Sequence, residues 1–398
     1  MSTRADWSGL FAHRAGLRGG EELAAILAGV PDGVLALTGG FPNPSTFATD
    51  VLGDIAARVL RDEPGLALQY TPVEGIPSVR SYLAERQESL QGRRPEPAEL
   101  MVTSGGMECI ALACAAMLEP GDAIAVEGPT YLGALMAFRG AEADVHEIPM
   151  DEDGLIVDAF AEQLEGGLRP KLLYVIPEYQ NPTGRTLPLE RREALVELCR
   201  RNGVLILEDV AYRELAWGAE PLPTLWSLAP DAVVQAGTFS KIFFPGVRLG
   251  WAAGPAEVVE QLAAAKANTD QCASALGQRM VEEYGRGGHF ESQLPRACEL
   301  YGSHWRALDG ALRASMPDGV TWTQPTGGFL TWVELPDGLD AMELCDAALE
   351  AGVAYVPGAP FYAGDAGANT LRLSFSALDE ADLAEAGRRL GSVLADAL

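Results

Sequence analysis

Lysine is rare in this chain, and one of its lysines lies in a distinctive setting. The 398 residues contain three lysines against 26 arginines, and Lys241 directly follows Ser240, with Arg248 seven residues further on. A lysine amine can form a Schiff base with an aldehyde, whereas arginine stays protonated. A serine hydroxyl and a guanidinium are natural ligands for a phosphate. An aldehyde and a phosphate on one small molecule indicate pyridoxal phosphate, although this segment alone is more typical of a surface lysine in a Gly/Pro loop.

A glycine pair precedes a predicted helix that begins near Glu108. Gly105 and Gly106 leave backbone N–H groups unobstructed at the positive end of the helix dipole, which suits an anion. They predict a second contribution to a phosphate site. An ordinary turn is the alternative.

Polar residues also follow two predicted strands. Asn181 opens an Asn-Pro-Thr-Gly sequence after the strand at 172–176, and Asp209 and Tyr212 follow the strand at 204–207. Open α/β sheets bind ligands beyond the carboxyl ends of their strands. An aspartate keeps the pyridine nitrogen of such a cofactor protonated, so that the ring acts as an electron sink. Asn181 and Tyr212 can donate hydrogen bonds to the phenolic oxygen. A turn at Asn181 and a capping role for Asp209 are the alternatives.

Two further side chains are candidates for the same site. Arg372 is the one charge in an apolar strand, where it is costly unless paired. Its guanidinium could hold the α-carboxylate of an amino acid through two hydrogen bonds, or it could form a structural salt bridge. Tyr131 could stack on a cofactor ring or belong to the core.

The elements that must position these residues alternate between strand and helix. Short β-branched runs predict strands, and longer amphipathic stretches between them predict helices, which together imply a mostly parallel sheet with helices on both faces. The predicted strands are 123–126, 172–176, 204–207 and 233–236, and the helices are 108–118, 131–138 and 188–201. Residues 255–286 predict one long helix. Strands at 321–335 and 370–375, with helices at 341–351 and 379–397, predict a smaller α+β unit. We therefore expect a large domain at 46–288, a small domain at 289–398 and an N-terminal segment, 1–45, that joins the small domain and the substrate site.

Composition excludes several classes of function. The net charge of −27 argues against nucleic-acid or anionic-membrane partners. No apolar run is long enough for a transmembrane helix, and the N-terminus lacks the apolar region of a secretory signal. Six scattered cysteines and four histidines show no metal-ligand spacing. They predict no metal site and free thiols in a reducing, cytoplasmic compartment.

Taken in order, these motifs resemble the fold-type I pyridoxal-phosphate-dependent aminotransferases of class I/II. The segments 37–44, 179–184 and 356–362 are most similar to the 2-aminoadipate/lysine-type branch, which also supplies the catalytic half of MocR-type regulators. The resemblance runs from about residue 10 to the C-terminus. It implies an α/β fold and transfer of the amino group of an L-α-amino acid to a 2-oxo acid, such as 2-oxoglutarate or pyruvate, through pyridoxamine phosphate.

The resemblance also implies roles for single residues. Lys241 would carry the Schiff base and move the proton, Asp209 would pair with the ring nitrogen, and Arg372 would bind the α-carboxylate. Tyr70 would reach the phosphate of a neighbouring subunit, which implies a homodimer with shared sites. The cofactor phosphate would be held by Gly105, Gly106, Met107, Ser240 and Arg248, the phenolic oxygen by Asn181 and Tyr212, and the ring by Tyr131. Substrate contacts would come from Gly40 and Asn181, with Arg18 a candidate for a distal carboxylate or for an exposed salt bridge.

Departures from the branch bear on the reaction. The phosphate loop usually reads Gly-Ser-Gln-Gln but here is Gly105-Gly106-Met107-Glu108, and residues 242–244 are bulkier than usual. These changes keep open a same-scaffold enzyme of β- or γ-elimination, replacement or cyclisation. A transcriptional regulator is the rival from another class. It would need an N-terminal winged-helix domain and a basic surface, and neither is expected in this sequence.

Overall fold

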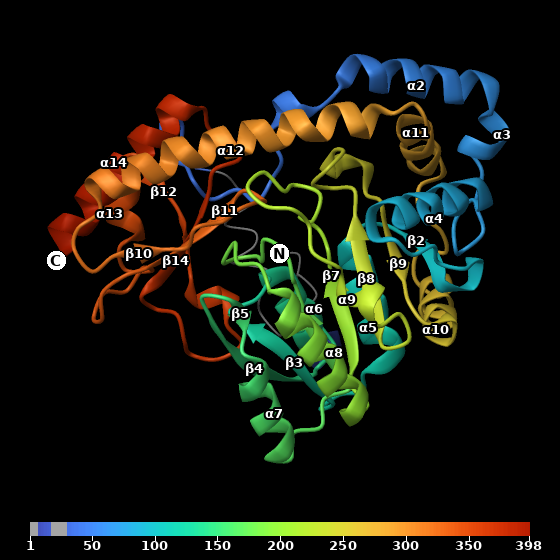
Figure 1. Cartoon of the computed structure of the whole chain (residues 1–398), viewed down its shortest axis with the longest axis horizontal. Helices are drawn as coiled ribbons and strands as arrows, with labels where there is room; N and C mark the ends of the chain where they lie inside the picture. Colours follow the sequence, from blue (N-terminus) through green and yellow to red (C-terminus); the bar gives the residue numbers. More distant parts are fainter. Residues whose placement is uncertain (1–6, 17–29) are drawn as a thin grey trace, which may run out of the picture.

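An eight-stranded sheet forms the centre of the computed structural model, which describes residues 7–16 and 30–398 (Figure 1). The strand order is β2-β9-β8-β7-β6-β3-β4-β5, and the neighbours from β8 through β4 pair in parallel. The pairs β2–β9, β8–β9 and β4–β5 are antiparallel. The bounds are β2 Leu100–Thr103, β3 Ala123–Gly128, β4 Asp144–Asp151, β5 Gly154–Leu155, β6 Leu172–Val175, β7 Leu205–Asp209, β8 Val233–Thr238 and β9 Gly250–Ala253. The predicted mostly parallel sheet is confirmed.

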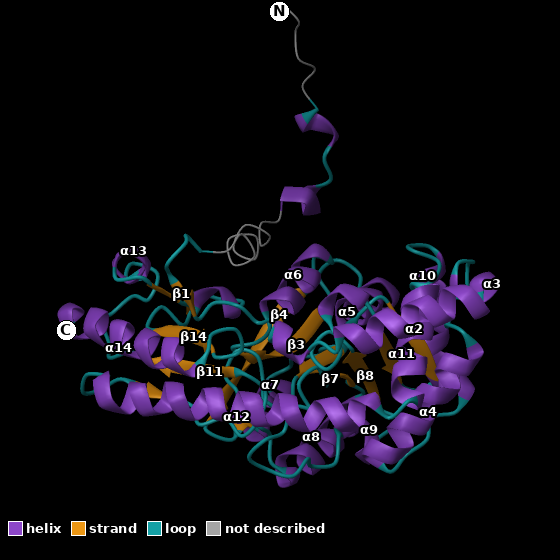
Figure 2. Ribbon diagram, turned by 90° about the horizontal axis from the view of Figure 1, so that it is seen from above, coloured by secondary structure: helices purple, strands orange, loops and turns teal. Residues whose placement is uncertain are grey.

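The side chains of the central strands point alternately to the two faces of the sheet, which explains why helices cover both faces. Leu172 and Tyr174 of β6 pack into one core with α5 (Gly106–Met117), α6 (Leu132–Gly140) and α10 (Ala256–Ala267), while Leu173 and Val175 pack into another. That second core includes residues of α7 Val157–Glu165, α8 Leu189–Asn202 and α9 Leu225–Leu228. Because successive strand residues point to opposite faces, an entirely buried strand needs a helical layer on each side. Figure 2 shows α5 and α6 on one side of the sheet and α8 and α9 on the other.

A smaller, antiparallel sheet lies beside the large one. Its order is β10-β11-β14-β13, with β10 Thr321–Trp322, β11 Leu330–Glu334, β14 Thr370–Ser374 and β13 Val356–Pro357. A separate pair joins β1 (Leu35–Ala36) to β12 (Val353–Ala354) in parallel, so a segment near the N-terminus lies against the C-terminal part of the chain. The long helix α12 (His289–Ser315) packs along α14 (Glu380–Ala397) beside this sheet (Figure 1).

The remaining helices are α2 Thr49–Asp62, α3 Pro64–Ala67, α4 Pro77–Gln91, α11 Ala275–Arg286 and α13 Cys345–Glu350. Two predictions about single elements were wrong. The expected helix at 255–286 is two helices, α10 and α11, because Gln271 has a φ of 67° and Ser274 caps α11 by accepting from Gly277 N. The expected strand at 321–335 is a hairpin, β10–β11, whose connection contains Gly328 at a φ of 64°. Both breaks come from local turn chemistry that interrupts an otherwise regular pattern.

The domain boundaries at residues 45 and 288 stay predictions. No helix among residues 7–16 and 30–398 has the length and apolarity that a membrane crossing requires.

Candidate active site

A cavity of about 270 Å³ lies where the carboxyl ends of β6, β7 and β8 meet the small sheet. Most of the residues predicted from sequence line it, although they come from segments up to 332 positions apart. They are Gly40, Gly106, Met107, Tyr131, Asn181, Asp209, Tyr212, Ser240, Lys241, Arg248 and Arg372. Its other lining residues are Phe41, Ile110, Leu132, Ile176, Ala211, Thr238, Pro245 and Phe361. The tertiary structure therefore brings the dispersed motifs into one site.

Two predicted residues lie elsewhere, and a third is not described. Gly105 does not line the cavity itself but lies against the guanidinium of Arg248, which does. Tyr70 does not line the cavity of its own chain, and its side chain is 81% exposed. Arg18 lies outside the described residues.

Lys241 presents its amine to the cavity. Nζ donates a hydrogen bond to the carbonyl oxygen of Gly40 at 2.7 Å, and it lies 5.7 Å from the centre of the Tyr212 ring. Desolvation and the nearby positive charge of Arg372 lower the pKa of Lys241 to about 8, against the attraction of Asp209. A larger fraction of the amine is therefore neutral, and so nucleophilic, near neutral pH than in free lysine.

Asp209 ends β7 and is buried. Its Oδ2 accepts from the hydroxyl of Tyr174 at 2.8 Å, and its Oδ1 accepts from Ala211 N at 3.0 Å. Burial raises the pKa of Asp209, while the two hydrogen bonds and Lys241 act to lower it. The sequence reasoning missed Tyr174, although a tyrosine hydroxyl inside an aliphatic strand signals a polar partner in the core.

Arg372 is held by uncharged groups. Nη1 donates to Asn181 Oδ1 at 3.1 Å and Nη2 to the carbonyl oxygen of Thr38 at 2.7 Å, while the guanidinium lies 5.0 Å from the centre of the Phe361 ring. Within residues 7–16 and 30–398 it forms no ion pair, and its buried Nε has no hydrogen-bond partner. Burial lowers the pKa of Arg372 to about 10. The described residues therefore do not show the alternative, a structural salt bridge at Arg372. A buried cation without a counter-ion suits an anionic ligand.

A second group of donors gathers at the start of α5. Gly105 has a φ of 98°, and a Cβ there would lie 3.0 Å from Arg248 Nη2. Arg248 Nη1 also donates to Ser240 Oγ at 3.3 Å. Backbone N–H groups, a hydroxyl and a guanidinium therefore converge at one end of the cavity. These donors fit a phosphate, the single buried Asp209 fits a ring nitrogen, and Lys241 fits an aldehyde, so the residues present fit pyridoxal phosphate.

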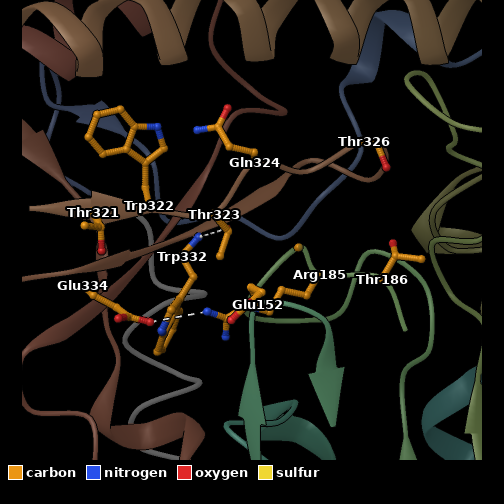
Figure 3. A pocket seen from close by; sticks show the side chains of 11 residues that line it. Glu152, Arg185, Thr186, Thr321, Trp322, Thr323, Gln324, Thr326, Trp332 and Glu334 are labelled. Carbon is orange, nitrogen blue, oxygen red and sulfur yellow. Dashed lines mark hydrogen bonds and ion pairs between the residues drawn. The ribbon is translucent and has the colours of Figure 1, made fainter. Parts of the chain in front are cut away.

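A larger groove of about 470 Å³ lies nearby but lacks this chemistry. It runs between the segment Gly184–Thr186 and strands β10 and β11, and Arg185 Nη2 lies 3.5 Å from Glu334 Oε1 across it (Figure 3). Threonine, glutamate and tryptophan side chains make up most of its wall. None of the residues predicted from sequence lines it, so volume alone does not identify the site.

The fold and the cavity together define a fold-type I pyridoxal-phosphate enzyme. A family model described as aminotransferase class I and II matches residues 43–390, and the chain belongs to this family. It is 39% identical over 366 residues to 2-aminoadipate transaminase of Thermus thermophilus, covering 91% of this chain and 90% of that protein. Aromatic-amino-acid aminotransferase 1 of Thermococcus litoralis is 37% identical, with 91% and 88% covered.

A solved structure shows the same similarity in three dimensions. The alpha-aminoadipate aminotransferase of Thermus thermophilus, complexed with N-(5'-phosphopyridoxyl)-L-leucine, superposes with a TM-score of 0.91 at 37% identity, covering 98% of this chain and 99% of that one. The protein is therefore a pyridoxal-phosphate-dependent aminotransferase acting on amino-acid and oxo-acid substrates. The expectations of fold class, cofactor and transamination are confirmed.

Proposed function

We propose that Lys241 is the residue that binds the cofactor aldehyde and moves the proton at the substrate α-carbon. The observation that carries this proposal is the position of its amine, in the cavity and with a lowered pKa. When bound, pyridoxal phosphate supplies a ring that withdraws electrons from the α-carbon. The amine of Lys241 would take the α-proton of the substrate and return it on the cofactor side, first as the general base and then as the general acid.

Asp209 would hold the cofactor ring in its protonated, electron-withdrawing state. Its carboxylate is buried, oriented by Tyr174 and in an ion pair with no arginine or lysine of the described chain. A charge–charge contact at such a site is strong because water is excluded. Tyr212 and the amide of Asn181 would donate to the phenolic oxygen, and Gly105, Gly106, Met107, Ser240 and Arg248 would bind the phosphate.

Arg372 would bind the α-carboxylate of the substrate. The guanidinium already has two neutral partners, and its Nε is buried and unpartnered within the described residues. An arriving carboxylate would supply the missing negative charge and fix the α-hydrogen toward Lys241.

We infer that the enzyme favours amino acids with apolar or aromatic side chains. Phe41, Leu132 and Phe361 form part of the cavity wall, and the cations that line it are Lys241, Arg248 and Arg372, each of which already has a proposed role. The relative named for aromatic amino acids supports this inference, whereas the substrate in the name of the other relative, 2-aminoadipate, carries a second carboxylate. A second, distal carboxylate would need a cation from outside this set, and Arg18 stays the candidate for that role.

The acceptor is proposed to be 2-oxoglutarate or pyruvate. Incubation of the enzyme with single amino acids, followed by absorbance and mass spectrometry of the cofactor, tests both substrates and reaction. Amination of the cofactor by phenylalanine, tyrosine or leucine, reversed by an oxo acid, is expected. Consumption of amino acids without cofactor amination would instead favour elimination, replacement or cyclisation.

We also propose a homodimer with shared sites, located in the cytoplasm. Tyr70 is 81% exposed, and Leu68 beside it is 68% exposed. In the proposed dimer Tyr70 would reach the phosphate of the neighbouring subunit, so its exposure in the single chain is what the proposal requires. All six cysteines are unpaired, which supports a reducing compartment.

A further inference from the structure

A buried lysine outside the cavity joins α10 to the loop before α5. The Lys266 side chain is 0% exposed. Its Nζ lies 2.7 and 2.8 Å from the two carboxylate oxygens of Glu108, and 2.7 and 2.9 Å from those of Asp270. Lys266 is in the last turn of α10, Asp270 follows that helix, and Glu108 is in the first turn of α5. In Figure 1 the two helices lie together beside the large sheet.

Both carboxylates also accept hydrogen bonds from Ser104, at the start of the glycine loop. Glu108 Oε2 accepts from Ser104 N at 2.6 Å, and Asp270 Oδ2 accepts from Ser104 Oγ at 2.7 Å. Ser104 is followed directly by Gly105 and Gly106, the proposed phosphate ligands. A chain of charge-assisted hydrogen bonds therefore runs from the end of α10 to the backbone that faces the cavity.

The charges explain why a lysine is needed here. A carboxylate in the first turn of a helix interacts with the same dipole end that binds a phosphate. Glu108 would therefore compete with the phosphate for this dipole end. Without a nearby cation, the carboxylates of Glu108 and Asp270 would also repel the phosphate. Burial raises the pKa of Glu108, although Lys266 and Ser104 N stabilise its charged form. Lys266 offsets one of these two negative charges without entering the cavity.

We propose that Lys266, together with Glu108 and Asp270, is a positioning cluster for the cofactor-phosphate site. It fixes the loop 104–107 against α10 and screens the loop from the charge of Glu108. The inference rests on the proposed placement of the phosphate at this loop, Ser240 and Arg248. It also gives a reason for the glutamate at position 108, where the related branch usually has glutamine.

Pyridoxal phosphate and pyridoxal differ only by the phosphate, so the ratio of their dissociation constants isolates this role. Both are titrated into the full-length apoenzyme. Lys266→Met is expected to raise the dissociation constant of pyridoxal phosphate by ~10- to 100-fold. The dissociation constant of pyridoxal should stay within about twofold of its native value. Lys171→Met is the matched control, because Lys171 is 46% exposed and pairs with Asp122 away from the cavity. It should change neither constant.

A second substitution tests the charge argument. Glu108→Gln, added to Lys266→Met, removes one of the two carboxylates that the lysine no longer balances, and so restores the original net charge of the cluster. The new amide oxygen can still accept from Ser104 N. Recovery of most of the lost affinity for pyridoxal phosphate is expected. A purely structural lysine would give a double variant at least as impaired as the single one, which would overturn the charge argument.

Arg248→Ala separates failure of this inference from failure of the phosphate placement. If Arg248→Ala lowers the selectivity for pyridoxal phosphate and Lys266→Met does not, the positioning cluster is wrong. If Arg248→Ala also leaves the ratio unchanged, the phosphate lies elsewhere and both proposals fall. Should Lys266→Met not fold, Ser104→Ala and Asp270→Asn decide: an unchanged ratio in both overturns the inference.

Discussion

Arg372 and Asn181 meet through a hydrogen bond of 3.1 Å between Nη1 and Oδ1, although 191 positions separate them. Arg372 belongs to β14 of the small sheet, and Asn181 follows β6 of the large one. This bond joins the proposed carboxylate ligand to a proposed ligand of the cofactor ring. It also turns the amide oxygen of Asn181 toward Arg372, which leaves the amide nitrogen as the donor for the cavity.

Replacement of Lys241 tests the central assignment. Lys241→Ala should lower kcat by about 10⁴-fold or more, because both the covalent anchor and the proton carrier are lost. Affinity for pyridoxal phosphate should fall less, since the phosphate ligands remain. Borohydride reduction of the wild-type holoenzyme and peptide mapping give the direct check. Label on Lys171 or Lys266 would contradict the assignment.

Asp209→Ala should lower kcat by about 10²- to 10³-fold, because the protonated ring nitrogen loses its buried counter-charge. Tyr174→Phe removes only the hydrogen bond to Asp209 Oδ2 and should cost less than about tenfold. Steady-state kinetics with saturating cofactor would rank the two variants. Near-native turnover of Asp209→Ala would place the partner of the ring nitrogen elsewhere.

Arg372→Lys should raise the KM for the amino acid by about tenfold or more, because an ammonium group cannot reproduce a two-pronged contact with a carboxylate. The dissociation constant of pyridoxal phosphate should stay near its native value. A comparison of the amino acid with the matching amine, which lacks the α-carboxylate, provides the control. Equal losses for both compounds would argue against a carboxylate site.

Cofactor uptake by the apoenzyme should depend on pH. The pKa of Lys241 is lowered to about 8 in the folded protein, so its neutral form grows as the pH rises from 7 to 9. Because the neutral amine attacks the aldehyde, the rate of uptake should rise through this range and level off above it. Stopped-flow absorbance would measure it. A rate that still rises steeply at pH 10 would indicate an ordinary lysine.

Shared sites predict complementation between inactive variants. In the proposed dimer, Lys241 of one subunit works with Tyr70 of the other. Lys241→Ala and Tyr70→Ala should each have low activity alone. After mixing, unfolding and refolding together, heterodimers would contain one intact site and recover activity. No recovery, despite heterodimers detected by mass spectrometry, would place Tyr70 outside the neighbouring site.

The sequence by itself determined the types of residue and their order. Alternating strands and helices predicted the large sheet, and the chemistry of Lys241, Asp209 and Arg372 predicted a cofactor with an aldehyde, a ring nitrogen and an amino-acid substrate. These predictions succeeded because strand ends, glycine turns and charged side chains in apolar strands have local physical signatures.

Only the tertiary structure decided which distant groups meet. Gly40 accepts a hydrogen bond from Lys241 across 201 positions, and Tyr174 orients Asp209 across the sheet. Residues 255–286 likewise read as one helix, yet they divide after α10, where Asp270 bonds to Lys266 and Ser104 instead of continuing the helix. Local propensity cannot foresee such partners, because the energy of a buried ion pair depends on packing between elements far apart in the chain.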